Sequence, residues 1–184
     1  MAYSEDRPGI RPRQSWGRRL DLAARHSFPA NCTILLMLLC QAPFGVVDQA
    51  ELLPVVTLTC VWFWSLFRPA AMPPPVVFAI GLLLDLLGYF PLGVGVLTAL
   101  TVHGLALRCR RGLAPQGFAV IWLVFAAVAA LAAALAWAMT MLLTFRLLPP
   151  GPALFQAVLS AALYPALAVP LARAHRTIAD PGRA

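Results

Sequence analysis

The chain has 184 residues, of which 61% are hydrophobic and 11% are charged, and its mean hydropathy is +0.80. A water-soluble domain of this length cannot bury so much apolar surface, so the composition predicts an all-α membrane protein. The formal charge of +7 comes from arginines alone, because the chain has no lysine. These arginines lie outside the apolar segments, where membrane orientation explains them, and we therefore expect no nucleic-acid partner.

Residues 1–27 form a basic arm interrupted by prolines. An arm of this composition is expected to be solvated in the cytoplasm and attracted to anionic lipid. The alternative is a specific docking motif for a cytosolic partner. The polar start, with no small-residue cleavage site before a soluble domain, argues against a cleaved signal peptide.

Six apolar segments follow within residues 28–172, and the second, third and fourth are short. They cover residues 28–47, 52–67, 76–90, 91–107, 118–145 and 153–171. A helix needs about 20 residues to cross the roughly 30 Å of hydrocarbon, so short segments imply local thinning or burial by neighbours. We expect six transmembrane helices. The alternative is that the third and fourth segments form a hairpin that does not cross.

The arginines set the orientation of these segments. With both termini in the cytoplasm, 13 of the 14 arginines lie on the cytoplasmic side, including those of the tail at 173–184, and only Arg146 lies opposite. This distribution follows the positive-inside rule. The sequence therefore predicts a multi-pass membrane protein with both termini in the cytoplasm and an even number of crossings.

Asp85 lies among leucines in GLLLDLLGYFPLG, where an unpaired carboxylate is costly. Gly81 and Gly88 share its helix face and allow close approach of another backbone. Pro91 then leaves free amide groups at the start of the next helix, which can satisfy the carboxylate. Asp85 is thus expected to hold the turn or to pair with Arg146, or else to contact a partner protein.

The remaining polar and sulfur-containing side chains show no pattern typical of a catalytic or metal site. Only one aspartate lies within a span, and neither Ser65 nor Ser160 has a recognisable base. His103 is expected to pack between helices rather than to relay protons. The four cysteines, at 32, 40, 60 and 109, show no metal-binding or disulfide spacing. We expect no enzyme, no catalytic residue, no metal and no cofactor.

Two further patterns predict packing. Alanines at 126, 130, 134 and 138 recur every four residues and are expected to pack against another helix of the same chain, an intermolecular interface being the alternative. Trp62, Trp64 and Phe67 precede Arg68 and are typical of an aromatic belt at the membrane interface.

The central third of the chain contains WFWSLFRP followed by PPPVVFAIGLLLDLLGYFPLG, and this ordered combination resembles the rod shape-determining protein MreD family. The matching positions are Trp62, Trp64, Arg68, Pro69, Phe78, Gly81, Leu82, Asp85, Gly88, Pro91, Leu92 and Gly93. They cover about 40 residues, and the flanking segments match only in hydrophobicity and length.

The resemblance implies a non-enzymatic scaffold of the bacterial cell-elongation complex, which controls rod shape through peptidoglycan synthesis. Such proteins bind MreC and connect indirectly to MreB filaments and to the peptidoglycan synthases, RodA and its penicillin-binding transpeptidase. It also implies a fold similar to the substrate-binding membrane subunits of energy-coupling-factor transporters. A small-molecule-binding subunit of a vitamin-type transporter is therefore the alternative.

On this basis one set of residues is expected to form a partner-binding surface or a structural hairpin. These residues are Gly81, Asp85, Gly88, Pro91, Leu92, Gly93, Arg68 and Pro69. Membrane lipids are the other expected partners.

Overall fold

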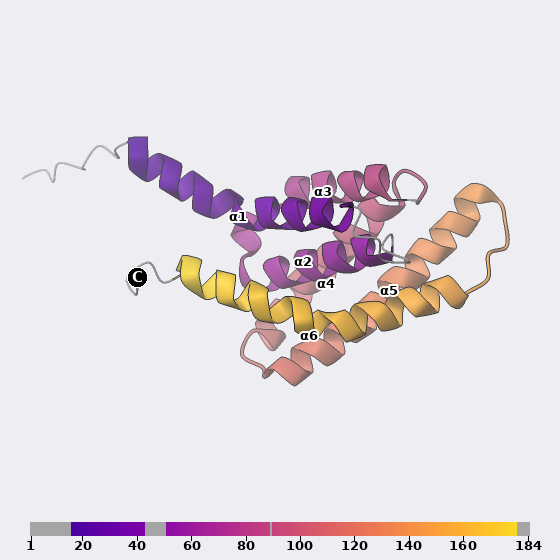
Figure 1. The fold of residues 1–184 in the computed structure, drawn as a ribbon. Helices are drawn as coiled ribbons and strands as arrows, with labels where there is room; N and C mark the ends of the chain where they lie inside the picture. Colours follow the sequence, from indigo (N-terminus) through magenta and orange to yellow (C-terminus); the bar gives the residue numbers. More distant parts are fainter. Residues whose placement is uncertain (1–15, 43–50, 89, 180–184) are drawn as a thin grey trace, which may run out of the picture.

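The computed structural model describes residues 16–42, 51–88 and 90–179, in which helices are joined by short turns and loops (Figure 1). The elements are α1 (Trp16–Cys40), α2 (Leu52–Phe67), the 3-10 turn η2 (Pro69–Ala71), α3 (Pro74–Leu87), α4 (Val94–Leu113), α5 (Phe118–Thr144) and α6 (Gly151–Ala179). No strand occurs among the residues described, so the all-α prediction is confirmed.

Several helices extend beyond the apolar segments that predicted them. Helix α1 begins at Trp16, twelve residues before the expected start, and continues through Pro29. Helix α4 begins at Val94 rather than at 91 and runs to Leu113, past its three arginines. Hydropathy marks the part of a helix that lipid can surround, whereas backbone hydrogen bonding continues into polar sequence.

Two helices of the described structure are long and apolar enough to cross a membrane. They cover Phe118–Thr144, with a hydropathy of 2.6, and Gly151–Arg176, with a hydropathy of 1.7. The apolar helices Ser27–Cys40, Leu52–Phe67 and Pro74–Leu87 are shorter. At 1.5 Å per residue, α2 is only about 24 Å long.

Helix α2 forms the centre of the bundle. Fourteen of its 16 residues are buried, and it contacts α1, α3, α4 and α6. Helices α5 and α6 pair along one side, joined by a loop that projects from the bundle (Figure 1). The central helix is therefore shielded by neighbours on all sides, whereas the α5–α6 pair exposes many apolar side chains.

The tryptophans of α2 belong to this core, so the prediction of an interfacial belt is wrong for them. Trp62 and Trp64 have no exposed surface. Their rings pack against Phe125 of α5 and Phe28 of α1, each with 6.0 Å between ring centroids. Phe67, one turn later, is half-buried.

The alanine stripe of α5 also faces the wrong way for the predicted packing. Its second, third and fourth members are exposed, and the first is half-buried. The buried alanines of this helix are Ala129, Ala132 and Ala133. Because α5 carries alanine on every face, the spacing of small residues could not choose the packed one.

Candidate functional site

The carboxylate of Asp85 lies at the turn between α3 and α4, where it caps the start of α4. Its Oδ2 accepts hydrogen bonds from the backbone amides of Gly93, at 2.8 Å, and Val96, at 3.3 Å, and its Oδ1 accepts one from Gly95 at 2.6 Å. The side chain is 4% exposed. The buried carboxyl group therefore meets the positive end of a helix dipole and its free donors.

This contact confirms the expectation that helix-start amides satisfy Asp85. Gly93, the N-cap residue of α4, has a positive φ of 99° and no side chain to cap the helix. Asp85 supplies the missing acceptors from eight residues upstream. Its bonds come from these amides rather than from Arg146, which lies exposed beyond α5.

Glycines make this contact possible by allowing α3 and α4 to touch. A Cβ on Gly81 would lie 2.6 Å from the Cα of Val96, and one on Gly95 would lie 2.6 Å from Oδ1 of Asp85. Atoms cannot approach so closely without displacing the backbone or breaking the cap. The face of Gly81 is therefore filled by α4, which fits the structural hairpin rather than the partner-binding surface at this residue.

Gly88 lies at the end of α3, in the structural part of the hairpin. Its backbone is extended, with φ −93° and ψ −176°, and a Cβ there would lie 2.7 Å from the carbonyl oxygen of Leu84. The residue thus ends α3 within its own chain. What remains at the surface of the hairpin is the corner formed by Pro91, Leu92 and Gly93, in which Leu92 is 68% exposed.

Arg68 and Pro69 lie far from this corner, so the predicted set divides into two places. Arg68 ends α2, with its amide donating to the carbonyl oxygen of Trp64 at 2.7 Å, and Pro69 begins η2. Asp85 lies eleven residues after Pro74, the first residue of α3, so the carboxylate is about 17 Å along the helix from the end that follows Arg68 and Pro69. These two residues shape the opposite end of the bundle.

A serine and a histidine meet in the core, contrary to the expectation that no serine has a neighbouring base. Ser65 Oγ and His103 Nδ1 are 2.7 Å apart and join α2 to α4. Ser65 has no exposed surface, and Nε2 of His103 has no hydrogen-bond partner in the described structure. The pair is a helix-to-helix contact, in agreement with the packing role predicted for His103.

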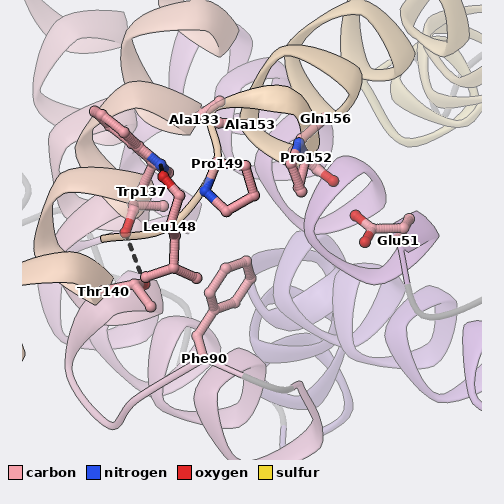
Figure 2. A pocket seen from close by; sticks show the side chains of 11 residues that line it. Glu51, Phe90, Ala133, Trp137, Thr140, Leu148, Pro149, Pro152, Ala153 and Gln156 are labelled. Carbon is pink, nitrogen blue, oxygen red and sulfur yellow. Dashed lines mark hydrogen bonds between the residues drawn. The ribbon is translucent and has the colours of Figure 1, made fainter. Parts of the chain in front are cut away.

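A cavity of about 140 Å³ adjoins the hairpin (Figure 2). Glu51 at the start of α2, Phe90 of the hairpin, Trp137 of α5, Pro149 of the α5–α6 loop and Gln156 of α6 contribute to its wall. Figure 2 shows Gln156 and Glu51 on one side of the cavity and Trp137 on the other. Trp137 Nε1 donates to the carbonyl oxygen of Leu148 at 3.1 Å, which attaches the loop to α5.

Two polar side chains of this cavity, Gln156 and Glu51, lack partners among the described residues. Gln156 is 8% exposed, yet neither its Nε2 nor its Oε1 has a hydrogen-bond partner in the described structure. Glu51, which is half-buried, also forms no hydrogen bond or ion pair with the residues described. Buried polar atoms are normally satisfied, so the unpaired amide of Gln156 can bond to a polar group that enters the cavity.

A second, smaller cavity lies between the first cavity and the hairpin. It measures about 20 Å³, shares Phe90 and Gln156 with the first and reaches Gly95, the residue that donates to Asp85. Sequence reasoning missed both Gly95 and Gln156. Both could have been recognised in the sequence. Gly95 is a second glycine, two residues after Gly93, at the start of a predicted helix, and Gln156 is a polar residue within an apolar segment.

No three His, Cys, Asp or Glu side chains come together as metal ligands within the described ranges. Comparison with protein-family models, with curated protein sequences and with solved structures found no match for this chain. Function must therefore be inferred from the all-helical fold, the capped hairpin and the adjoining cavity.

Proposed function

We propose that this chain is a non-enzymatic scaffold of the bacterial inner membrane that binds MreC within the cell-elongation complex. The observation that carries the proposal is the hairpin, in which Asp85 holds an exposed corner beside a cavity with unpaired polar groups. The resemblance of this same stretch to the MreD family supplies the partner. MreB filaments, RodA and its transpeptidase are then reached indirectly.

In this proposal all six helices cross the membrane, with both termini in the cytoplasm. The shortness of α2 is compatible with a crossing, because its neighbours bury it and lipid need not match its length. The arginine distribution supports the orientation. Asp85, Glu51 and the cavity then lie at the periplasmic end.

The outer face of α3 provides a surface for a partner helix. Phe78, Leu82 and Leu86 recur at four-residue spacing on the exposed side of this helix, and two of them match the family motif. Leu92, at the hairpin corner that follows α3, is also exposed. A transmembrane helix such as that of MreC would pack along α3 by van der Waals contact.

The volume of the cavity favours a protein partner over a vitamin-sized ligand. A space of about 140 Å³ suits one ring or one side chain, since a cavity of about 150 Å³ holds benzene. Sites for larger small molecules usually measure about 300–1,000 Å³. We propose that a partner side chain enters between Phe90 and Pro149 and bonds to Gln156 or Glu51.

The second candidate function, a small-molecule-binding subunit of a transporter, is favoured by the same unpaired amide of Gln156. It requires the α5–α6 loop to open and enlarge the cavity. Stoichiometric binding of a vitamin-like molecule to the purified protein, lost in Gln156→Leu, would support it over the scaffold.

Affinity purification from solubilised inner membranes tests the scaffold. The wild-type chain should retain MreC, whereas Asp85→Leu and Gly88→Leu should lose it and give rounded cells while the protein remains inserted. If both variants retain MreC and rod shape at normal protein levels, the hairpin is not the interface.

A further inference from the structure

A third, larger cavity lies at the end of the bundle remote from Asp85. It measures about 530 Å³ and is open to the surface. Phe67 at the end of α2, Phe118 at the start of α5, and Tyr164, Arg173 and Arg176 of α6 contribute to its wall. Helix α4 ends nearby, with Arg110 Nε donating to the carbonyl oxygen of Leu66 at 3.1 Å. In the proposed orientation this end faces the cytoplasm.

The inner wall of this cavity is apolar and aromatic. The rings of Phe118 and Tyr164 are stacked with centroids 6.1 Å apart, and Phe63 and Phe67 lie 4.8 Å apart on the opposite helix. Ala168 and Ala172 of α6 keep the space between them open. A surface of this kind attracts hydrocarbon rather than a polar solute.

The rim of the cavity is positively charged. Arg173 and Arg176 lie three residues apart on α6, so both side chains lie on one face of the helix beside the opening. Gly117, the N-cap residue of α5, has no side chain that caps the helix, and the dipole of α5 adds positive potential beside Phe118. Among the described residues that line the cavity, none is acidic.

We propose that this cavity binds an anionic glycerophospholipid, with its phosphate at Arg173 and Arg176 and an acyl chain against the aromatic wall. The volume lies within the usual range of ligand sites. Basic cavities between membrane helices on the cytoplasmic side are the places where anionic head groups bind. This inference rests on one part of the proposed function, namely that the helices lie in a membrane, and it does not depend on binding to MreC.

Native mass spectrometry of the full chain in detergent tests the ligand class. The protein is titrated with phosphatidylglycerol, with phosphatidylcholine of the same acyl chains, and with glycerol phosphate. Phosphatidylglycerol should bind about tenfold more tightly than phosphatidylcholine, because only its head group carries net negative charge, and glycerol phosphate should not bind. Equal affinity for both lipids would overturn the proposal, and glycerol phosphate binding as tightly as the lipid would remove the role of the apolar wall.

A matched pair of variants tests the site. Arg173→Gln/Arg176→Gln should weaken phosphatidylglycerol binding about 10- to 30-fold, at roughly 1 kcal/mol for each arginine. Arg108→Gln/Arg111→Gln removes the same charge at the same spacing from exposed positions of α4 outside this cavity. It should weaken binding less than threefold. Equal losses in the two double variants would show non-specific attraction and contradict the site.

Filling the cavity gives a test that keeps every charge. Ala172→Phe should weaken binding about tenfold, whereas Ala166→Phe, on an exposed part of α6 outside the cavity, should not. Unchanged binding in Ala172→Phe would contradict the proposed chain position. A chain recovered in the soluble fraction without detergent would overturn the membrane proposal itself, whereas an inserted chain without lipid preference would overturn this inference only.

Discussion

At the end of the bundle that holds Asp85, the two sides differ in whether a buried polar side chain finds a hydrogen-bond partner. On the hairpin side, the carboxylate of Asp85 accepts three backbone hydrogen bonds, and Gln41 donates to the carbonyl oxygen of Leu87 at 2.8 Å. On the α5–α6 side, Gln156 is equally buried but unpaired. A satisfied group fixes geometry, whereas an unsatisfied one is available for a ligand. The hairpin side therefore has a fixed geometry, and it lies next to a side whose buried amide can still form hydrogen bonds.

Substitution of the contact glycine of α3 should have the largest effect. Gly81→Ala places a Cβ 2.6 Å from the backbone of α4 and should lower the free energy of unfolding by about 3 kcal/mol. Gly104→Ala on α4, where a Cβ meets no atom within 4 Å, should instead raise it by up to about 1 kcal/mol. Thermal unfolding in detergent, followed by reactivity of the buried Cys60 thiol, measures both. A tolerated Gly81→Ala would show that the helices do not touch there.

Loss of the cap should rank next. Asp85→Leu leaves the amides of Gly93, Gly95 and Val96 without their acceptor and should cost about 1 to 3 kcal/mol. Asp85→Asn keeps the size and one acceptor oxygen, so its cost should be smaller. The same thiol assay compares them, and equal stabilities for the two variants would contradict the capping role.

The serine–histidine contact should contribute less. Ser65→Ala leaves Nδ1 of buried His103 without its partner and should cost about 1 to 2 kcal/mol. His103→Leu and the double variant complete a cycle in which the coupling between the two side chains should be about 1 kcal/mol. Additive losses would show that the 2.7 Å contact does not stabilise the packing of α2 on α4.

The smallest effect should have the opposite sign. Gln156→Leu removes an unpaired buried amide from an apolar wall and should raise the free energy of unfolding by up to about 1 kcal/mol. The same variant should weaken the association with MreC. A destabilised Gln156→Leu would mean that the amide is satisfied in the folded protein and would remove the contrast with Asp85.

Sequence reasoning predicted those features that depend on local order along the chain. The helical class follows from the apolar segments, and the cap follows from a carboxylate placed before a proline and a helix start. It failed where the rotation of one helix against another decides the outcome. Ser65 and His103 are 38 residues apart, and nothing in either segment reveals that their faces meet.

Errors in choosing the packed face of a helix are expected for helices in a membrane. Apolar side chains face both the core and the surroundings of a membrane helix, so hydrophobicity does not separate the two. Hydrophobicity therefore predicts an interface position for Trp62 and Trp64, although both are core residues. The four-residue spacing of alanines in α5 predicts the wrong packed face for the same reason. Gln156 was detectable as a polar residue, but its lack of a partner required the positions of its neighbours.

Site-specific photo-crosslinking tests the central claim that the α3 face and the hairpin corner bind the partner. A crosslinking residue replaces Leu86 or Leu92 in the full chain, with Leu123 of α5 as the control because it is 69% exposed, close to the 66% of Leu86. MreC should be captured from positions 86 and 92 and not from 123. Capture from 123 alone, or from none of the three while MreC still co-purifies, would contradict the account.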